Sequence, residues 1–256
     1  MIEFDKEGKI SQLKAWALTG NIDDNKLLKI FKMLELGKRS DRSKDDPVQF
    51  PHFYCQDDNA LSWHDPSKHS WVKLLEDNFE PIKKEASRVF ENNLMNIHPE
   101  NNELACYGNW NIFFFYKNGI KYLDNHLKCP FTSSIIDKIT GTEIAGRTYF
   151  SMMPPGIHIK AHCGPHNFKL RTHLGIVTPK EATIRVASEE RDWIEGKCIV
   201  FDDSFEHEVW NKSSVMRIVL IVDVWNPSLT KLEIQALEYI MQEFYHPEEV
   251  LSEVTV

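Results

Sequence analysis

Seven short apolar segments between residues 147 and 225 constrain the fold of this chain more than any other feature of its sequence. Turn-forming residues such as Pro155-Gly156 and Gly164-Pro165 separate most of these segments. Short strands at this spacing are typical of an antiparallel β-sandwich or jelly roll. We expect strands at 147–153, 157–162, 168–177, 182–187, 197–201, 206–211 and 215–225.

The sequence on either side of this run has a different periodicity. Apolar residues recur at helical spacing, which predicts helices within 1–45, ending at Gly37, and at 71–90, 132–139 and 229–244. An alternating pattern at 110–116 predicts one more strand, and 38–46 is a charged, turn-rich linker. The chain therefore predicts an α+β fold, a jelly-roll core with a helical N-terminal region and a C-terminal helix. We divide it into a helical segment (1–45), a mixed region packing on the core (46–140), the β core (141–228) and a C-terminal helix with its tail (229–256).

Charge and composition exclude several classes of protein. The formal net charge of −8 argues against a nucleic-acid binder, which normally presents a basic face. The longest apolar runs are far below the ~18 residues of a spanning helix, and the polar N-terminus is no secretory signal. The five cysteines form no CxxC pair, which argues for a reducing compartment. We expect a cytoplasmic protein, a monomer, with no membrane or nucleic-acid partner.

Histidine is the residue type that stands out, since the chain has 11 of them, as many as glycine. His162 ends one expected strand and His207 opens another, and a jelly roll can bring two such positions together at one mouth of the barrel. Imidazole is a good ligand for iron, zinc, copper or nickel. From spacing alone, ordinary core or surface histidines explain the pair better than a metal site does. His158 and His166 are expected to be non-ligands, because the prolines and glycines around them forbid a histidine-bearing helix.

Cationic side chains on two expected strands suggest a site for carboxylates. Arg217 falls in a strand that otherwise looks buried, where it needs either a nearby acid or a bound carboxylate held bidentately. Lys169, Arg171 and His173 alternate along another strand and so share one face. That face is either exposed to solvent or lines a barrel lumen that binds carboxylates. Asp202, Asp203 and Glu206 lie close to His207 in the sequence.

Several motifs in a fixed order resemble the aspartyl/asparaginyl β-hydroxylase family. The resemblance is dense over 145–230 and weaker upstream, at 63–66 and 108–110. The motifs are Ser151 to His158, Ala161 to Asn167, Lys169 to Gly175, Trp193 to Gly196, Phe201 to Asn211 and Asp223 to Pro227.

The resemblance implies a dioxygenase that uses Fe(II), 2-oxoglutarate and O2 on a double-stranded β-helix, a jelly-roll variant. It implies that His162 and His207 are the iron ligands, while Gly164 stands where most related oxygenases have a carboxylate ligand. By the same resemblance, Ser151 and Arg217 hold the distal carboxylate of 2-oxoglutarate. Arg171 and His173 lie near its C1 carboxylate and the substrate.

The implied reaction is hydroxylation of the β-carbon of an Asp or Asn residue in a peptide or protein. Lys169 stands where animal members carry arginine, which leaves the identity of the substrate open. A free amino acid or small precursor is an alternative substrate, and a catalytically silent carboxylate-binding jelly roll is an alternative function. A zinc hydrolase would want a third protein ligand, which no motif position offers. The acids near His207 either orient its ring or only form a turn.

Overall fold

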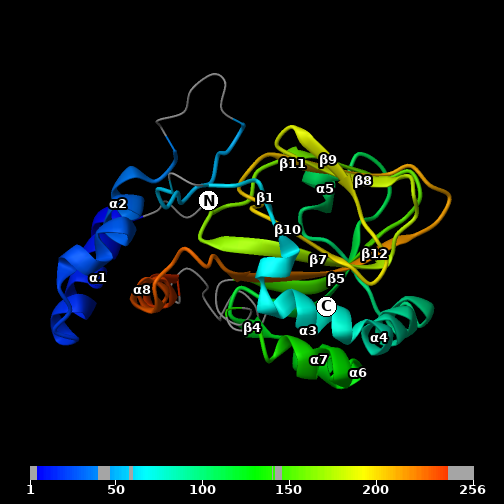
Figure 1. Ribbon diagram of the computed structural model, residues 1–256, viewed down its shortest axis with the longest axis horizontal. Helices are drawn as coiled ribbons and strands as arrows, with labels where there is room; N and C mark the ends of the chain where they lie inside the picture. The colour runs from blue at the N-terminus through cyan, green and yellow to red at the C-terminus, as the bar shows by residue number, and fades with distance from the viewer. Residues whose placement is uncertain (1–4, 40–46, 58–59, 140, 142–145, 242–256) are drawn as a thin grey trace.

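The computed structural model describes residues 5–39, 47–57, 60–139, 141 and 146–241. Within them two antiparallel sheets face each other, and helices cover the outer face of the larger one (Figure 1). The larger sheet has the strand order β1-β10-β7-β12-β5-β3-β2, with β4 beside β3, and the smaller sheet has the order β6-β11-β8-β9. The fold class is therefore α+β with a double-stranded β-helix core, as expected.

The strands of the core lie within one or two residues of their expected positions. They are β5 (Arg147–Met153), β6 (His158–His162), β7 (Lys169–Val177), β8 (Ala182–Val186), β10 (Cys198–Phe201), β11 (His207–Asn211) and β12 (Arg217–Trp225). The strand expected at 110–116 is β3 (Asn111–Lys117). The other strands were not expected: β1 (Trp63–His64), β2 (Asn96–Ile97), β4 (Ile120–Lys121) and β9 (Glu189–Asp192). Three of them have only two residues, and β9 is entirely polar, so no hydrophobic alternation marks any of them in the sequence.

The helix expected at 71–90 is two helices, α3 (Ser70–Asp77) and α4 (Phe79–Glu91). Pro81 explains the break, because its ring nitrogen cannot donate to the carbonyl of Asp77 and the ring clashes with that turn. The helix expected at 132–139 begins earlier, as α7 (Pro130–Ile136), and is preceded by α6 (Leu123–Lys128). A short α5 (Asn101–Leu104) and the 3-10 turn η2 (Pro66–Lys68) complete the middle of the chain.

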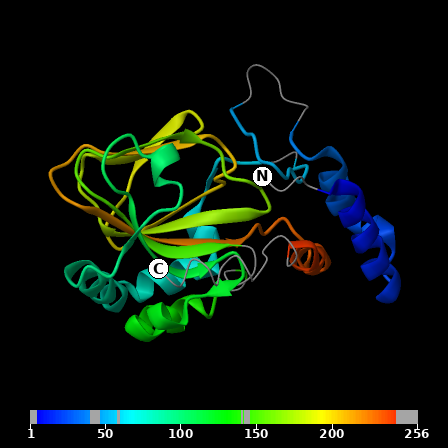
Figure 2. The same cartoon turned by 180° about the vertical axis from the view of Figure 1, so that it is seen from behind.

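The helices nearest the two termini pack together at one end of the larger sheet (Figure 2). The N-terminal elements are α1 (Lys6–Thr19), η1 (Asp24–Leu27) and α2 (Leu28–Leu36), and Gly37, at φ 63°, ends α2 as expected. The C-terminal helix is α8 (Lys231–Met241); the rest of the helix expected to 244 and most of the linker expected at 38–46 lie outside the described residues. Among the described residues, no helix has both the length and the apolar character needed to cross a bilayer.

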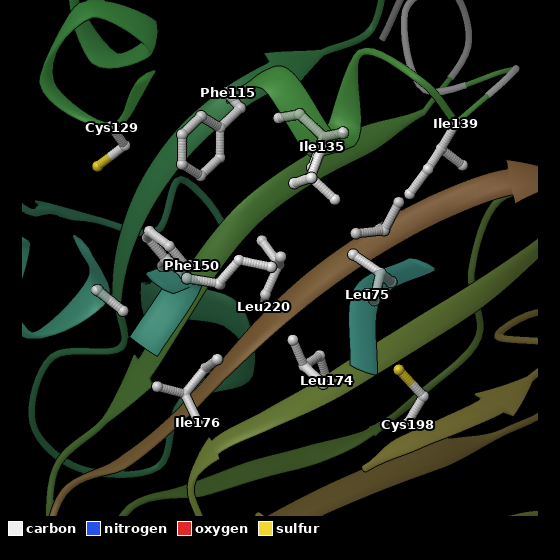
Figure 3. Packing of buried hydrophobic residues seen from close by; sticks show 14 of the residues in the cluster. Leu75, Phe115, Cys129, Ile135, Ile139, Phe150, Leu174, Ile176, Cys198 and Leu220 are labelled. Carbon is white, nitrogen blue, oxygen red and sulfur yellow. The ribbon is translucent and has the colours of Figure 1, made fainter. Parts of the chain in front are cut away.

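Alternating side chains divide the larger sheet between two cores. Leu174 of β7, Phe150 of β5 and Leu220 of β12 pack against α3, α4 and α7 on the outer face (Figure 3). Their neighbours in sequence, such as Tyr149, Val219 and Ile221, face the smaller sheet and form the core of the barrel. Because side chains two apart share a face, the inward positions also include Arg217 on β12 and, on β7, Lys169, Arg171 and His173. Both faces of these strands are thus covered by protein.

Candidate active site

Two histidines face each other at one mouth of the barrel. His162 and His207 are register partners on β6 and β11, and their ring centroids are 4.2 Å apart. The loops that carry them are joined, since the Gly164 N–H donates to the Asp203 carbonyl at 2.7 Å. The structure therefore brings together two side chains that are 45 positions apart in the chain.

Both imidazoles have one ring nitrogen tied to the backbone. Nδ1 of His162 lies 2.7 Å from the Lys160 carbonyl oxygen, and Nδ1 of His207 lies 2.9 Å from that of Phe205. A carbonyl only accepts, so each Nδ1 carries the proton and each Nε2 keeps its lone pair. Burial lowers the pKa of His162, and lowers that of His207 well below the ordinary value. Two neutral imidazoles with free Nε2 atoms are the state in which histidine binds a metal.

The position of the missing carboxylate ligand is sterically closed. A Cβ atom on Gly164 would lie 2.7 Å from the carboxyl carbon of Asp203. Within the described residues no group of three His, Cys, Asp or Glu side chains is arranged to hold a metal ion. The donor set fits a transition-metal ion held by two imidazoles, with the remaining positions left to water or a chelating cosubstrate.

A narrow inner cavity of about 30 Å³ extends from the two histidines toward Arg217. The Arg217 side chain is 2% exposed, and among the described residues it has no acidic partner. Its Nη1 lies 3.3 Å from the Ser151 hydroxyl, which also accepts a hydrogen bond from Trp110 Nε1 at 2.9 Å. Burial lowers the pKa of Arg217 to about 9. The expectation of a nearby acid partner is thus wrong for the described residues, and a buried, unpaired guanidinium calls for an anion.

His173 adds a second unsatisfied donor to the same cavity. Trp193 Nε1 donates to His173 Nδ1 at 3.3 Å, which places the imidazole proton on Nε2. That Nε2 is buried without a hydrogen-bond partner among the described residues, as is Nε of Arg217. The Trp193 ring also lies 4.9 Å from the Arg217 guanidinium carbon. Trp110 and Trp193 were not expected as site residues. The position of a tryptophan in the sequence does not show whether its ring only packs or also donates a hydrogen bond within a site.

Arg171 is already held by two carboxylates. Its Nε and Nη2 donate to the two oxygens of Asp223 at 2.8 and 2.9 Å, and its Nη1 lies 2.9 Å from Asp203 Oδ2. Burial alone would raise the pKa of Asp223, but the guanidinium outweighs it and holds that pKa well below the usual range. The role of Arg171 toward a cosubstrate stays a prediction, because these acids occupy most of its donors.

An outer cavity of about 490 Å³ shares His162, Arg171 and His207 with the inner one. Lys169, 2% exposed, lines it, and its Nζ has no hydrogen-bond partner among the described residues. Burial lowers the pKa of Lys169 to about 7. The interpretation of Lys169, Arg171 and His173 as a solvent face is therefore wrong, because the smaller sheet and the loops of the barrel mouth cover that face.

The remaining polar residues have structural partners. Asp202 accepts from the Ser204 N–H at 2.9 Å, as in a simple turn, and Asp203 pairs with Arg171. The hypothesis that these acids orient His207 is wrong, since the Phe205 carbonyl does so. Outside the pair, His158 contacts Glu208 and His166 stacks on Phe168. Arg147 and its partner Glu100, 2.9 Å away, also line the outer cavity and were missed, because they come from segments without a motif.

Comparison with known proteins identifies the family of this chain. The family model of Aspartyl/Asparaginyl beta-hydroxylase matches residues 76–227. The mouse protein "Aspartyl/asparaginyl beta-hydroxylase" is 39% identical over 187 residues, 71% of this chain and 25% of its own length. The Rhizobium tropici "Ornithine lipid ester-linked acyl 2-hydroxylase" is 33% identical over 172 residues, 64% of this chain and 60% of its own length. This chain thus spans less than two thirds of either relative.

Among solved structures, a Pseudomonas putida prolyl-4-hydroxylase aligns with a TM-score of 0.37 at 14% identity, covering 61% of this chain and 100% of its own. The family assignment rests on the sequence match, which extends over more than half of the 256 residues. The chain belongs to the aspartyl/asparaginyl β-hydroxylase family, and its core is a double-stranded β-helix.

Proposed function

We propose that this chain is an Fe(II)- and 2-oxoglutarate-dependent dioxygenase that hydroxylates the β-carbon of an Asp or Asn residue in a peptide or protein. The observation that carries the proposal is the pairing of two imidazoles with free Nε2 atoms and an unpaired, buried Arg217 along one cavity. A 2-oxo dicarboxylic acid matches both ends, since it chelates a metal at one end and carries an anionic carboxylate at the other.

The residues of the chain have distinct tasks in this proposal. His162 and His207 hold the metal through Nε2, and their backbone-bound Nδ1 protons keep the rings in one orientation. Arg217 and the Ser151 hydroxyl receive the distal carboxylate of 2-oxoglutarate. His173 offers its Nε2 proton to the same ligand, held in that tautomer by Trp193. When bound, iron, 2-oxoglutarate and O2 supply the oxidant for C–H hydroxylation, with succinate and CO2 as co-products.

The outer cavity supports a substrate with an acidic or amide side chain. Arg171 and Arg147 are paired with Asp203, Asp223 and Glu100, which leaves Lys169 as the cation without a hydrogen bond among the described residues of this cavity. A substrate carboxylate beside Lys169 would favour its charged form, so binding of an acidic substrate and protonation of the amine support each other. Lysine makes this contact as a point charge, without the fork of arginine.

A free amino acid or small precursor is a second candidate substrate. The relative from Rhizobium tropici, whose printed name describes a lipid acyl 2-hydroxylase, favours this candidate. The outer cavity of about 490 Å³ is large enough for a small molecule as well as for one side chain of a peptide.

The test is anaerobic calorimetry of 2-oxoglutarate binding with and without Fe(II), followed by succinate detection with Asp- and Asn-containing peptides in air. We expect iron-dependent binding that Arg217→Met abolishes, while Arg88→Met on α4, outside the barrel, leaves it unchanged. A +16 mass shift on the peptide supports the proposal. Binding and succinate formation only with small molecules supports the second candidate, binding without any turnover indicates a silent module, and no binding overturns both.

A further inference from the structure

A second group of chemically active side chains lies on the outer face of the smaller sheet. His158 of β6 and Glu208 of β11 alternate with Ile159 and Val209, whose side chains pack in the barrel core. His158 and Glu208 point away from the metal site, because a β-bulge between the His207–His162 and Val209–Ile159 pairs reverses the alternation along β6. Cys106, which follows α5, completes the group and lines neither of the two cavities described above.

The three side chains form a continuous chain of contacts. Cys106 Sγ lies 3.5 Å from His158 Nδ1, and His158 Nε2 lies 3.2 Å from Glu208 Oε2. The Cys106 N–H donates to the His158 carbonyl at 3.0 Å, which ties the two residues together through the backbone. Trp210 stacks on the imidazole with a centroid distance of 5.1 Å, and Arg185 donates to the second oxygen of Glu208 at 2.6 Å. The ring is thus held on one side by a carboxylate and presents its other nitrogen to a thiol.

This order of groups is that of an activated nucleophile: a thiol within reach of a base, and the base oriented by a carboxylate. Three other cysteines of the chain are enclosed instead. Burial raises the pKa of Cys55 and Cys129 to about 12 and raises that of Cys198 further, so these three stay protonated and enclosed. Cys106 is half-exposed and therefore open to small reagents.

We propose that Cys106 is a reactive thiol, a site of modification by peroxides and soft electrophiles, with His158 as the proton acceptor and Glu208 as the group that orients it. With hydrogen peroxide, the S–H proton passes to His158 Nδ1 and the sulfur attacks one peroxide oxygen. The S–O bond forms as the O–O bond breaks, and the leaving hydroxide takes the proton from His158 to become water. Sulfur is oxidised by two electrons to a sulfenic acid, and the peroxide is reduced by two.

The experiment measures the alkylation rate of each cysteine in the whole, reduced chain with limiting iodoacetamide, resolved by peptide mass spectrometry. Cys106 should react at least about tenfold faster than Cys163, the other half-exposed cysteine, and peroxide followed by a sulfenic-acid trap should mark Cys106 first. His158→Ala should slow Cys106 by about tenfold or more, and added imidazole should restore part of the rate, which loss of a merely structural contact would not allow.

A matched control is His69→Ala, because His69 also stacks on a tryptophan, Trp71 at 4.4 Å, and should leave the Cys106 rate unchanged. If His158→Ala unfolds the chain, the buried cysteines become reactive, and Glu208→Gln then provides the test through a several-fold slower Cys106. The proposal is overturned if Cys106 reacts no faster than Cys163, or if folded His158→Ala keeps the full Cys106 rate. If Cys106 reacts as fast in a folded Glu208→Gln variant as in the unchanged chain, Glu208 does not orient His158.

Discussion

The buried amine of Lys169 makes the stability of this protein depend on pH in a way that a single substitution can isolate. The side chain is 2% exposed, its Nζ has no hydrogen-bond partner among the described residues, and burial lowers its pKa from 10.5 to about 7. Arg171 and Arg147 disfavour the charged amine further, while Asp203 and Asp223 oppose the shift. Methionine is apolar and similar in length, so Lys169→Met removes the titrating group and keeps most of the packing.

The magnitude follows from the two pKa values. Because the folded-state pKa of Lys169 is lowered, the unfolded chain binds more protons than the folded one between pH 7 and 10.5. In that window the wild-type free energy of unfolding rises with pH by up to about 1.4 kcal/mol per unit. Below it, both states are protonated and the full penalty, on the order of 5 kcal/mol, is present. The advantage of Lys169→Met should therefore shrink by about 2 kcal/mol between about pH 6.5 and pH 8.5.

Urea denaturation of both proteins at these two pH values measures the difference directly. Lys231→Met on α8 is the control, because that lysine is exposed and the same change of side chain there reports the effect of methionine alone. An advantage of Lys169→Met that is equal at the two pH values would refute the reasoning, since it would mean that the buried amine does not titrate between them.

Three further substitutions test the geometry of the site. Gly164→Asp should not create a third iron ligand, because its Cβ would lie 2.7 Å from the carboxyl carbon of Asp203; we expect about 1–3 kcal/mol of lost stability, and tighter anaerobic iron binding would contradict this. Asp223→Asn removes the bidentate acceptor of a buried guanidinium and should lower the free energy of unfolding by about 3–5 kcal/mol, which a loss under 1 kcal/mol would disprove. Trp193→Phe removes the N–H that sets the His173 tautomer and should weaken 2-oxoglutarate binding by about fivefold in calorimetry, with unchanged affinity as the opposing result.

Much of the fold could be predicted because strand periodicity is a local property. The residues that share one face of β7 were identified from alternation alone, since side chains two apart must point the same way. Alternation did not reveal which face was inside, because the helices cover one face of the larger sheet and the smaller sheet covers the other. The break between α3 and α4 was overlooked for a related reason: the apolar period continues through Asn78, while Pro81 interrupts the hydrogen bonds.

The residues of the site were also predictable only in part. Sequence motifs pointed to His162, His207 and Arg217, and the structure places all three along the two connected cavities. The partners of Arg171 were not predictable, since Asp203 and Asp223 lie on other strands and loops and reach it only after the barrel closes. The same holds for the closed space beside Gly164, because a steric conflict between two loops has no signature in either loop.

From the chain alone came the strand order along the sequence, the shared face of alternating residues and the chemical types available for a metal and a carboxylate. These properties follow from local backbone geometry and from the chemistry of each side chain, neither of which depends on the folded structure. Tertiary structure decided which charges are paired, as in Arg171, and which are buried without a partner, as in Lys169 and Arg217. Pairing and desolvation depend on groups brought together from distant strands, and they are the terms that set charge, stability and binding at this site.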